Sequence, residues 1–282
     1  MSERPIRLGL SLTCVGPVSE MVDEARRAEQ LGFDTVSLVD HLGFTAPLPP
    51  LVAIAASVPN IRVGNLVLNT AFYRPSLLAR DLASVDSASG GRLEIGLGAG
   101  YVESEFLRIG LPFSKPADRI RLLTEHVLEI RRCFSDPGYA PPAVQKRAPV
   151  LIAGMGYKLL GMAARHADII SIGGLNTEAF LAERVEYVKT QAAERLDDIE
   201  LAFTFFQVSL DDHDDLSALY LVQPDADPAD LRQAATLLDG SVSEAADRIR
   251  RYREAFGITY FTLHKTSATS WGTLQKLVDA IK

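Results

Sequence analysis

The sequence has little cysteine, no excess of positive charge and no long apolar run. Its two cysteines, Cys14 and Cys133, lie far apart among 282 residues and form no metal-binding pattern. The formal net charge of −7 argues against nucleic acid or an anionic membrane surface as a partner. The N-terminal apolar run is too short for a signal peptide, and no later run approaches a membrane-spanning length. We therefore expect a protein of the reducing cytoplasm.

Eight short apolar runs recur along the chain, each followed by a stretch with helical character. They are Ile6–Leu12, Thr35–Asp40, Ile61–Leu68, Leu93–Leu97, Pro149–Ala153, Ile169–Ile172, Ile199–Leu210 and Ile258–Leu263. Most are near-continuous Leu, Ile and Val, as expected for strands buried on both faces of a parallel sheet. Eight strand–helix units predict an α/β fold of the (β/α)8 TIM-barrel type. Because we find no domain boundary, residues 1–282 are expected to form a single domain.

Local signals predict where several segments begin and end. Ser19 is expected to cap the first helix and Gly32 to end it. The Pro-rich segment 43–50 and the acidic stretches Asp211–Asp215 and Pro224–Leu231 are expected to be loops. Further helices are expected from about Pro75, over Ala117–Phe134, over Tyr157–His166 and from Ser241 to Phe256.

In such barrels the catalytic groups lie at the carboxyl ends of the strands. Asp40 and His41 end the second run, where barrel enzymes place acid–base groups. The alternative is an aspartate that caps the next turn beside a surface histidine. His264 and Lys265 end the last run, and both are expected to face the barrel mouth as secondary candidates.

Glycines mark two further places. Gly154-Met155-Gly156 follows the fifth run and opens a helix, where backbone N–H groups can hold a phosphate. These glycines can equally serve the turn alone. Gly96, Gly98 and Gly100 alternate at the fourth run, either packing inside a crowded barrel or leaving room for a flat ring across its mouth.

The remaining polar candidates are assigned structural roles. His126 and His166 fall inside predicted helices. His213 lies in the acidic loop, where at most an adventitious metal site is expected. Arg92 precedes the fourth run, at the end of the barrel that is associated with stability.

Four blocks together resemble the luciferase-like oxidoreductase superfamily, and within it the branch that uses the deazaflavin coenzyme F420. They are AEQLGFDTVSLVDH (28–41), VGNLVLNTAFYRP (63–75), SVDSASGGRLEIGLGAG (84–100) and IAGMGYKLLGMAARHADI (152–169). The SGGR-to-GxGxG part is the most specific. The resemblance implies a bacterial-luciferase-like TIM barrel and an F420-dependent oxidoreductase, with FMN as the alternative cofactor.

The resemblance also implies roles for particular residues. In this family a non-prolyl cis peptide lies in the bulge of the third strand, here at Leu66-Val67 or an immediate neighbour. Asp40 would bond the polar edge of the ring, and Asn69 would contact the ring or the ribityl chain. The cofactor-binding set is therefore Asp40, Leu66, Val67, Asn69, Gly98, Gly154, Met155 and Gly156.

One departure from the family bears on the substrate. Members that oxidise a sugar phosphate carry a glutamate directly after the glycines of strand four, where this sequence has Tyr101. The expected pocket wall is aromatic (Phe44, Phe72, Tyr73 and Tyr101), which favours a small aromatic or conjugated substrate, with Glu103 and Glu105 as polar contacts. His41 is the first candidate for the proton donor, with Tyr101 and His264 in reserve. A homodimer is expected.

Three other functions compete with this interpretation. The first is an FMN-dependent monooxygenase of the same fold. The second is a metal-dependent hydrolase, which the missing His-x-His pair in Ile6–Leu12 disfavours. The third is a barrel that binds a flavin-like ligand or a partner without catalysis.

Overall fold

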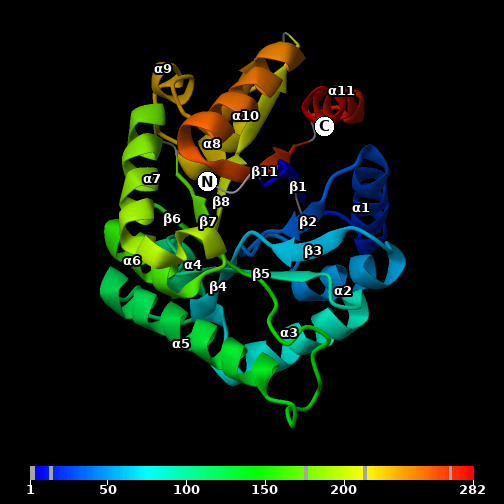
Figure 1. Cartoon of the computed structure of the whole chain (residues 1–282), viewed down its shortest axis with the longest axis vertical. Helices are drawn as coiled ribbons and strands as arrows, with labels where there is room; N and C mark the ends of the chain where they lie inside the picture. Colours follow the sequence, from blue (N-terminus) through cyan, green and yellow to red (C-terminus); the bar gives the residue numbers. More distant parts are fainter. Residues whose placement is uncertain (1–3, 13–14, 175–176, 212–214, 267–268) are drawn as a thin grey trace.

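The computed structural model describes residues 4–12, 15–174, 177–211, 215–266 and 269–282. Parallel strands form a closed ring surrounded by helices (Figure 1). The strands of the ring are β1 (Arg7–Leu12), β2 (Thr35–Leu38), β3 (Arg62–Asn65), β4 (Leu68–Asn69), β5 (Leu93–Gly98), β6 (Val150–Gly154), β7 (Ile169–Ile172), β8 (Glu200–Phe205) and β11 (Ile258–Lys265). Pairing of β3 with β5 closes the ring, and β4 continues the path of β3 after a break. The predicted (β/α)8 barrel is confirmed.

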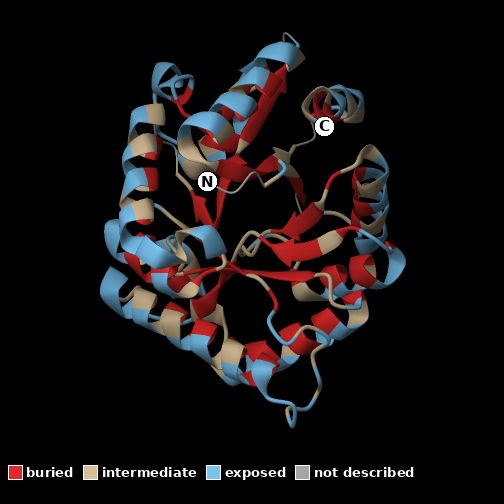
Figure 2. Cartoon of the chain, viewed as in Figure 1, coloured by how far each residue is buried: buried red, intermediate tan, exposed pale blue. Residues whose placement is uncertain are grey.

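The helices lie between the strands along the chain, and most of them surround the ring (Figure 1). They are α1 (Val18–Leu31), α2 (Leu48–Ser57), α3 (Pro75–Ser89), α4 (Glu103–Arg108), α5 (Pro116–Ser135), α6 (Tyr157–His166), α7 (Glu178–Ala192), α8 (Ser217–Val222), α9 (Pro228–Leu231), α10 (Val242–Phe256) and α11 (Trp271–Ile281), with the 3-10 turns η1 (Thr70–Phe72) and η2 (Ala193–Asp198). Buried residues gather in the strands and on the helix faces turned toward them (Figure 2). Burial of this apolar surface is the main driving force for the fold.

Several helix ends lie where the sequence predicts them. α3 begins at Pro75, and α6 has the predicted bounds. Gly32 ends α1 with a φ of 89°, in the left-handed region that glycine favours. Ser241 caps α10 through a reciprocal capping box with Glu244.

Two local predictions were wrong. Ser19 lies within the first turn of α1, which begins after Pro17 and has no side-chain cap in the described structure. The Pro-rich segment 43–50 is not loop throughout, because α2 begins at Leu48. Prolines fit in the first turn of a helix, since the N–H groups there have no partner within the helix.

The predicted strand Ile199–Leu210 is two strands. β8 ends at Phe205 within the barrel, whereas β9 (Gln207–Leu210) pairs in parallel with β10 (Leu237–Gly240) in a separate sheet. Both β8 and β9 are buried along their whole length, so their apolar residues run together in the sequence. Of the two acidic stretches expected to be loops, Pro224–Leu231 contains α9, and α8 lies between the two stretches.

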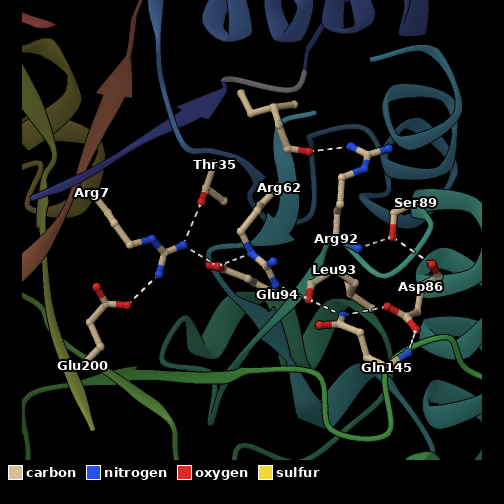
Figure 3. Close-up of polar contacts among 11 residues, drawn as sticks. Arg7, Thr35, Arg62, Asp86, Ser89, Arg92, Leu93, Glu94, Gln145 and Glu200 are labelled. Atoms are coloured by element: carbon tan, nitrogen blue, oxygen red, sulfur yellow. Dashed lines mark hydrogen bonds and ion pairs between the residues drawn. The ribbon is translucent and has the colours of Figure 1, made fainter. Parts of the chain in front are cut away.

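The interior of the barrel has an ionic floor near the amino ends of its strands (Figure 3). Arg7 pairs with Glu94 and, at 2.6 Å, with Glu200, while Arg62 Nε donates to Glu94 Oε1 at 2.6 Å. Burial lowers the pKa of Arg7, but Glu94 and Glu200 more than offset this and raise it. We call these four residues the barrel-floor network, which joins β1, β3, β5 and β8.

Candidate active site

The break between β3 and β4 is a bulge that contains a cis peptide bond. This bond is Leu66-Val67, the position that the family resemblance implied. Both side chains are half-buried and pack against an apolar cluster inside the barrel. That cluster is Leu151, Ile169, Ala202 and Tyr260, with Ala153 packed against it. The bulge therefore presents apolar side chains to the barrel interior.

The alternating glycines of β5 make room for this bulge. A Cβ added at Gly96 would lie 1.7 Å from the carbonyl oxygen of Asn65, and one added at Gly98 would lie 2.6 Å from Val67 Cγ2. Real Cβ contacts are never this short, so a larger residue at either position would displace the bulge. Of the two alternatives for these glycines, the structure favours packing. Gly98 packs against Val67 of the bulge, and the bulge is the segment that was expected to support the cofactor ring.

Asp40 connects the end of β2 with the segment after the bulge. Its Oδ2 accepts hydrogen bonds from the Asn69 backbone N–H at 3.0 Å and from the Tyr73 hydroxyl at 3.1 Å. Burial raises the pKa of Asp40, and these two hydrogen bonds partly offset the rise. Burial also raises the pKa of Tyr73, as does the neighbouring Asp40. Asn69 Oδ1 accepts from Ala71 N–H at 3.2 Å and so caps η1.

His41 lies beside Asp40 but has different partners. Its Nδ1 is 2.9 Å from Glu105 Oε1, an oxygen that also accepts the Leu42 backbone N–H at 3.0 Å. On the other side of the ring, Nε2 lies 3.5 Å from the Tyr101 hydroxyl. The Glu105 side chain is 12% exposed and that of His41 31%. The carboxylate thus holds the imidazole from its buried side and leaves Nε2 directed toward the more exposed tyrosine.

The turn between β6 and α6 has the features of an anion site. Gly156 is the N-cap of α6, and a Cβ added there would meet no atom of the described residues within 4 Å. Met155 is exposed, and its carbonyl oxygen accepts from Arg184 Nε at 2.9 Å, which ties the turn to α7. An open helix N-terminus of this kind can bind a phosphate through its N–H groups.

His264 and Lys265 differ in orientation at the end of β11. Nδ1 of His264 lies 3.4 Å from Ser11 Oγ, and burial lowers its pKa to about 4. A histidine with that pKa is neutral near pH 7. It lacks the second ring proton that makes a charged imidazolium a good proton donor. Lys265 Nζ pairs with Glu24 of α1 at 2.8 Å, so the expectation that it faces the barrel mouth was wrong.

The predicted aromatic wall separates into two groups. Phe44 and Tyr101 both lie edge-on to the His41 ring, with centroids 6.3 and 5.7 Å away. Phe72 instead packs on Phe106, a buried residue of α4, with centroids 6.1 Å apart. Aromatic side chains therefore surround His41 on two sides.

The residues expected to be structural have structural contacts where they are described. His126 lies buried in α5, and His166 is the last residue of α6. The Arg92 guanidinium donates to the backbone carbonyls of Ile61 and Ala55. Cys14 and His213 lie outside the described residues.

Two features were not recognised in the sequence. Glu105 was expected only as a polar contact near the mouth, although it is the partner of His41. The barrel-floor network was missed entirely. Glu94 offered a signal, because it is a charged residue within the otherwise apolar run Leu93–Leu97.

Neither a metal cluster nor a membrane segment emerges from the described ranges. They bring together no group of three His, Cys, Asp or Glu side chains suited to a metal ion. Their helices are also too short or too polar to cross a membrane.

The fold and these contacts define a (β/α)8-barrel protein with polar groups and a helix N-terminus at the carboxyl ends of its strands. A family model described as luciferase-like monooxygenase matches residues 5–282. The chain belongs to this family.

Curated relatives resemble parts of the chain. An F420-dependent glucose-6-phosphate dehydrogenase of Nakamurella multipartita is 36% identical over 138 residues, which are 45% of this chain and 40% of that protein. A 5,10-methylenetetrahydromethanopterin reductase of Archaeoglobus fulgidus is 28% identical over 166 residues, which are 54% of this chain and 48% of that protein. The chain spans about half the length of the curated relatives it matches.

A solved structure resembles the whole chain. It is that of an F420-dependent secondary alcohol dehydrogenase in complex with an F420–acetone adduct. The two superpose with a TM-score of 0.86 over 99% of this chain and 100% of the other, at 16% identity. At this identity the likeness shows the shared fold alone.

Proposed function

We propose that this chain is an F420-dependent oxidoreductase that transfers a hydride between F420 and a small aromatic or conjugated substrate. The observation that carries the proposal is the open N-terminus of α6 at Gly156, at the same end of the barrel as the bulge and His41. The F420 dependence named for the Nakamurella relative supports this cofactor. The second candidate is an FMN-dependent monooxygenase, which the description of the matched family favours.

The residues at the barrel mouth fit a flat ring that carries a phosphate. Leu66 and Val67 would support the ring through apolar contacts, and Asp40 would bond its polar edge. The N–H groups of the turn at Gly156 would hold the phosphate, since the space in front of this residue is open. When bound, F420 would supply the hydride.

In this proposal His41 donates or accepts the proton that is transferred along with the hydride. With its Nδ1 proton directed to Glu105, Nε2 accepts a proton when the ring is neutral and donates one when it is charged. Glu105 would act as a positioning residue, because it fixes the orientation of the imidazole. Tyr101 lies next to Nε2 and would contact the substrate.

We further propose that the substrate is not a sugar phosphate, although curated relatives are named glucose-6-phosphate dehydrogenases. Tyr101 replaces the glutamate that sugar-phosphate enzymes of the family carry, and Phe44 adds a second aromatic side chain at His41. Flat apolar surfaces of this kind suit an aromatic or conjugated molecule. A single domain, a homodimer and a cytoplasmic location belong to the same proposal.

The first test compares the two cofactors. F420 is expected to bind at least about tenfold more tightly than FMN, a difference of about 1.4 kcal/mol. Isothermal titration calorimetry on the purified protein measures both dissociation constants, and quenching of Trp271 and tyrosine fluorescence checks them. Equal affinities, or tighter binding of FMN, would transfer the assignment to the monooxygenase.

The second test concerns the phosphate. Gly156→Val is expected to raise the dissociation constant for F420 at least about tenfold, because the added side chain occupies the space in front of the helix N-terminus. The fold should tolerate it, since Gly156 has a φ of −79° and its Cβ would have room. Calorimetry and thermal unfolding measure the two effects.

The matched control is Gly272→Val on α11, where an added Cβ would also have space, because it would lie 3.9 Å from Ser270 Oγ. It should change neither cofactor binding nor the melting temperature by much. Normal cofactor binding by Gly156→Val would mean that the phosphate lies elsewhere.

A further inference from the structure

A small cavity lies inside the barrel between the barrel-floor network and the bulge. Its volume is about 10 Å³, at the lower limit for a cavity that can hold one water molecule. The polar residues that line it are Thr35, Ser37, Asn65, Glu94, Tyr260 and Thr262. Leu66 of the bulge lines it as well, so the cavity extends to the cis peptide bond.

Three of the residues that line this cavity have side-chain polar atoms without a hydrogen-bond partner among the described residues. These atoms are Ser37 Oγ, both the Oδ1 and Nδ2 of Asn65, and Glu94 Oε2. Each of the three residues is at most 4% exposed. A buried polar atom without a partner costs about 1–3 kcal/mol, and more when it carries charge.

Of these three residues, Glu94 has the strongest need for a further hydrogen-bond donor, because its unpaired atom belongs to a carboxylate. Its Oε1 accepts from both Arg7 and Arg62, whereas the buried Oε2 of the same carboxylate has no protein donor in the described structure, and Glu94 lines the cavity. Native proteins satisfy nearly all buried polar groups, with ordered water where protein groups do not suffice.

We propose that one water molecule is bound in this cavity as a fixed part of the barrel. It donates a hydrogen bond to Glu94 Oε2 and is bonded to Ser37 Oγ and to the side-chain amide of Asn65. Three hydrogen bonds are the usual number for a buried water. This inference does not depend on the proposed function.

Through its hydrogen bonds to Glu94 and Asn65, the water connects the barrel-floor network with the bulge. Asn65 immediately precedes the cis peptide, and its carbonyl oxygen fills the space that a side chain at Gly96 would need. An amide held by the water therefore fixes the backbone at the point where β3 leaves its regular path. Through this contact the floor supports the position of the bulge.

Ser37→Ala tests the proposal through the sign of its effect on the melting temperature. If a water is bonded to Ser37, loss of the hydroxyl removes one of its partners, and the melting temperature should fall by about 2–6 °C. If the hydroxyl has no partner, its removal relieves an unsatisfied polar group, and the melting temperature should rise.

Ser171→Ala is the matched control, because Ser171 is equally buried in β7 and its hydroxyl lies 3.5 Å from Thr204 Oγ1. A comparable fall in the two variants supports a bonded Ser37. A high-resolution crystal structure should also show water density within hydrogen-bond distance of Ser37 Oγ and Glu94 Oε2. A melting temperature of Ser37→Ala that stays the same or rises, or a cavity without density, would overturn the proposal.

Discussion

Replacing Glu94 with glutamine is expected to lower the free energy of unfolding by about 3–5 kcal/mol. The Glu94 side chain is 5% exposed and pairs with both Arg7 and Arg62. Glutamine keeps the shape but removes the charge, so Arg7 and Arg62 lose the buried carboxylate that they share. Urea unfolding followed by circular dichroism measures the change.

Asp23→Asn is the matched control for this charge removal. Asp23 pairs with Arg26 on the surface of α1, where their side chains are 73% and 47% exposed. A solvent-exposed pair contributes at most about 1 kcal/mol. A loss for Glu94→Gln no larger than that for Asp23→Asn would contradict a stabilising role of the barrel-floor network.

The positions of most barrel strands along the chain could be predicted because parallel strands buried on both faces form near-continuous apolar runs. The same pattern explains the error at Ile199–Leu210. β8 and β9 are both buried, and even the polar Gln207 that follows Phe206 is buried, so no exposed residue marks the point where the chain leaves the barrel. Burial can be inferred from apolar residues, but the identity of the strand's neighbour cannot.

The candidate site could be predicted only in part for a related reason. The residues Asp40, His41 and the turn at Gly156 were found from their place after a strand or before a helix. The partner of His41 is Glu105, 64 residues further along the chain, and nothing local in the sequence connects them. Likewise, what fills the space beside Gly96 is a carbonyl oxygen of another strand. Contacts between distant segments require the fold.

Replacing His41 with alanine is expected to lower kcat by about 10²–10⁴-fold while the dissociation constant for F420 stays nearly unchanged. Hydride addition to a conjugated system leaves an anion that must be protonated, and His41 presents Nε2 at the barrel mouth for that step. The substitution should not unfold the protein, because the side chain is 31% exposed. Steady-state kinetics measure the effect, once a screen of quinones and enones with reduced F420 has found a substrate.

Asp40→Ala provides the comparison, since Asp40 and His41 are neighbours with separate partners. Asp40 holds the Asn69 backbone and the Tyr73 hydroxyl, so its loss loosens the segment after the bulge and should raise the dissociation constant for F420. At saturating F420 its kcat should fall less than that of His41→Ala. His41→Ala is expected to change mainly kcat, and Asp40→Ala mainly the dissociation constant for F420. A general disturbance of this end of the barrel would affect both variants in the same way and so cannot produce this difference. Full kcat in His41→Ala would remove His41 from the mechanism and leave Tyr101, 3.5 Å from its Nε2, as the next proton donor to replace.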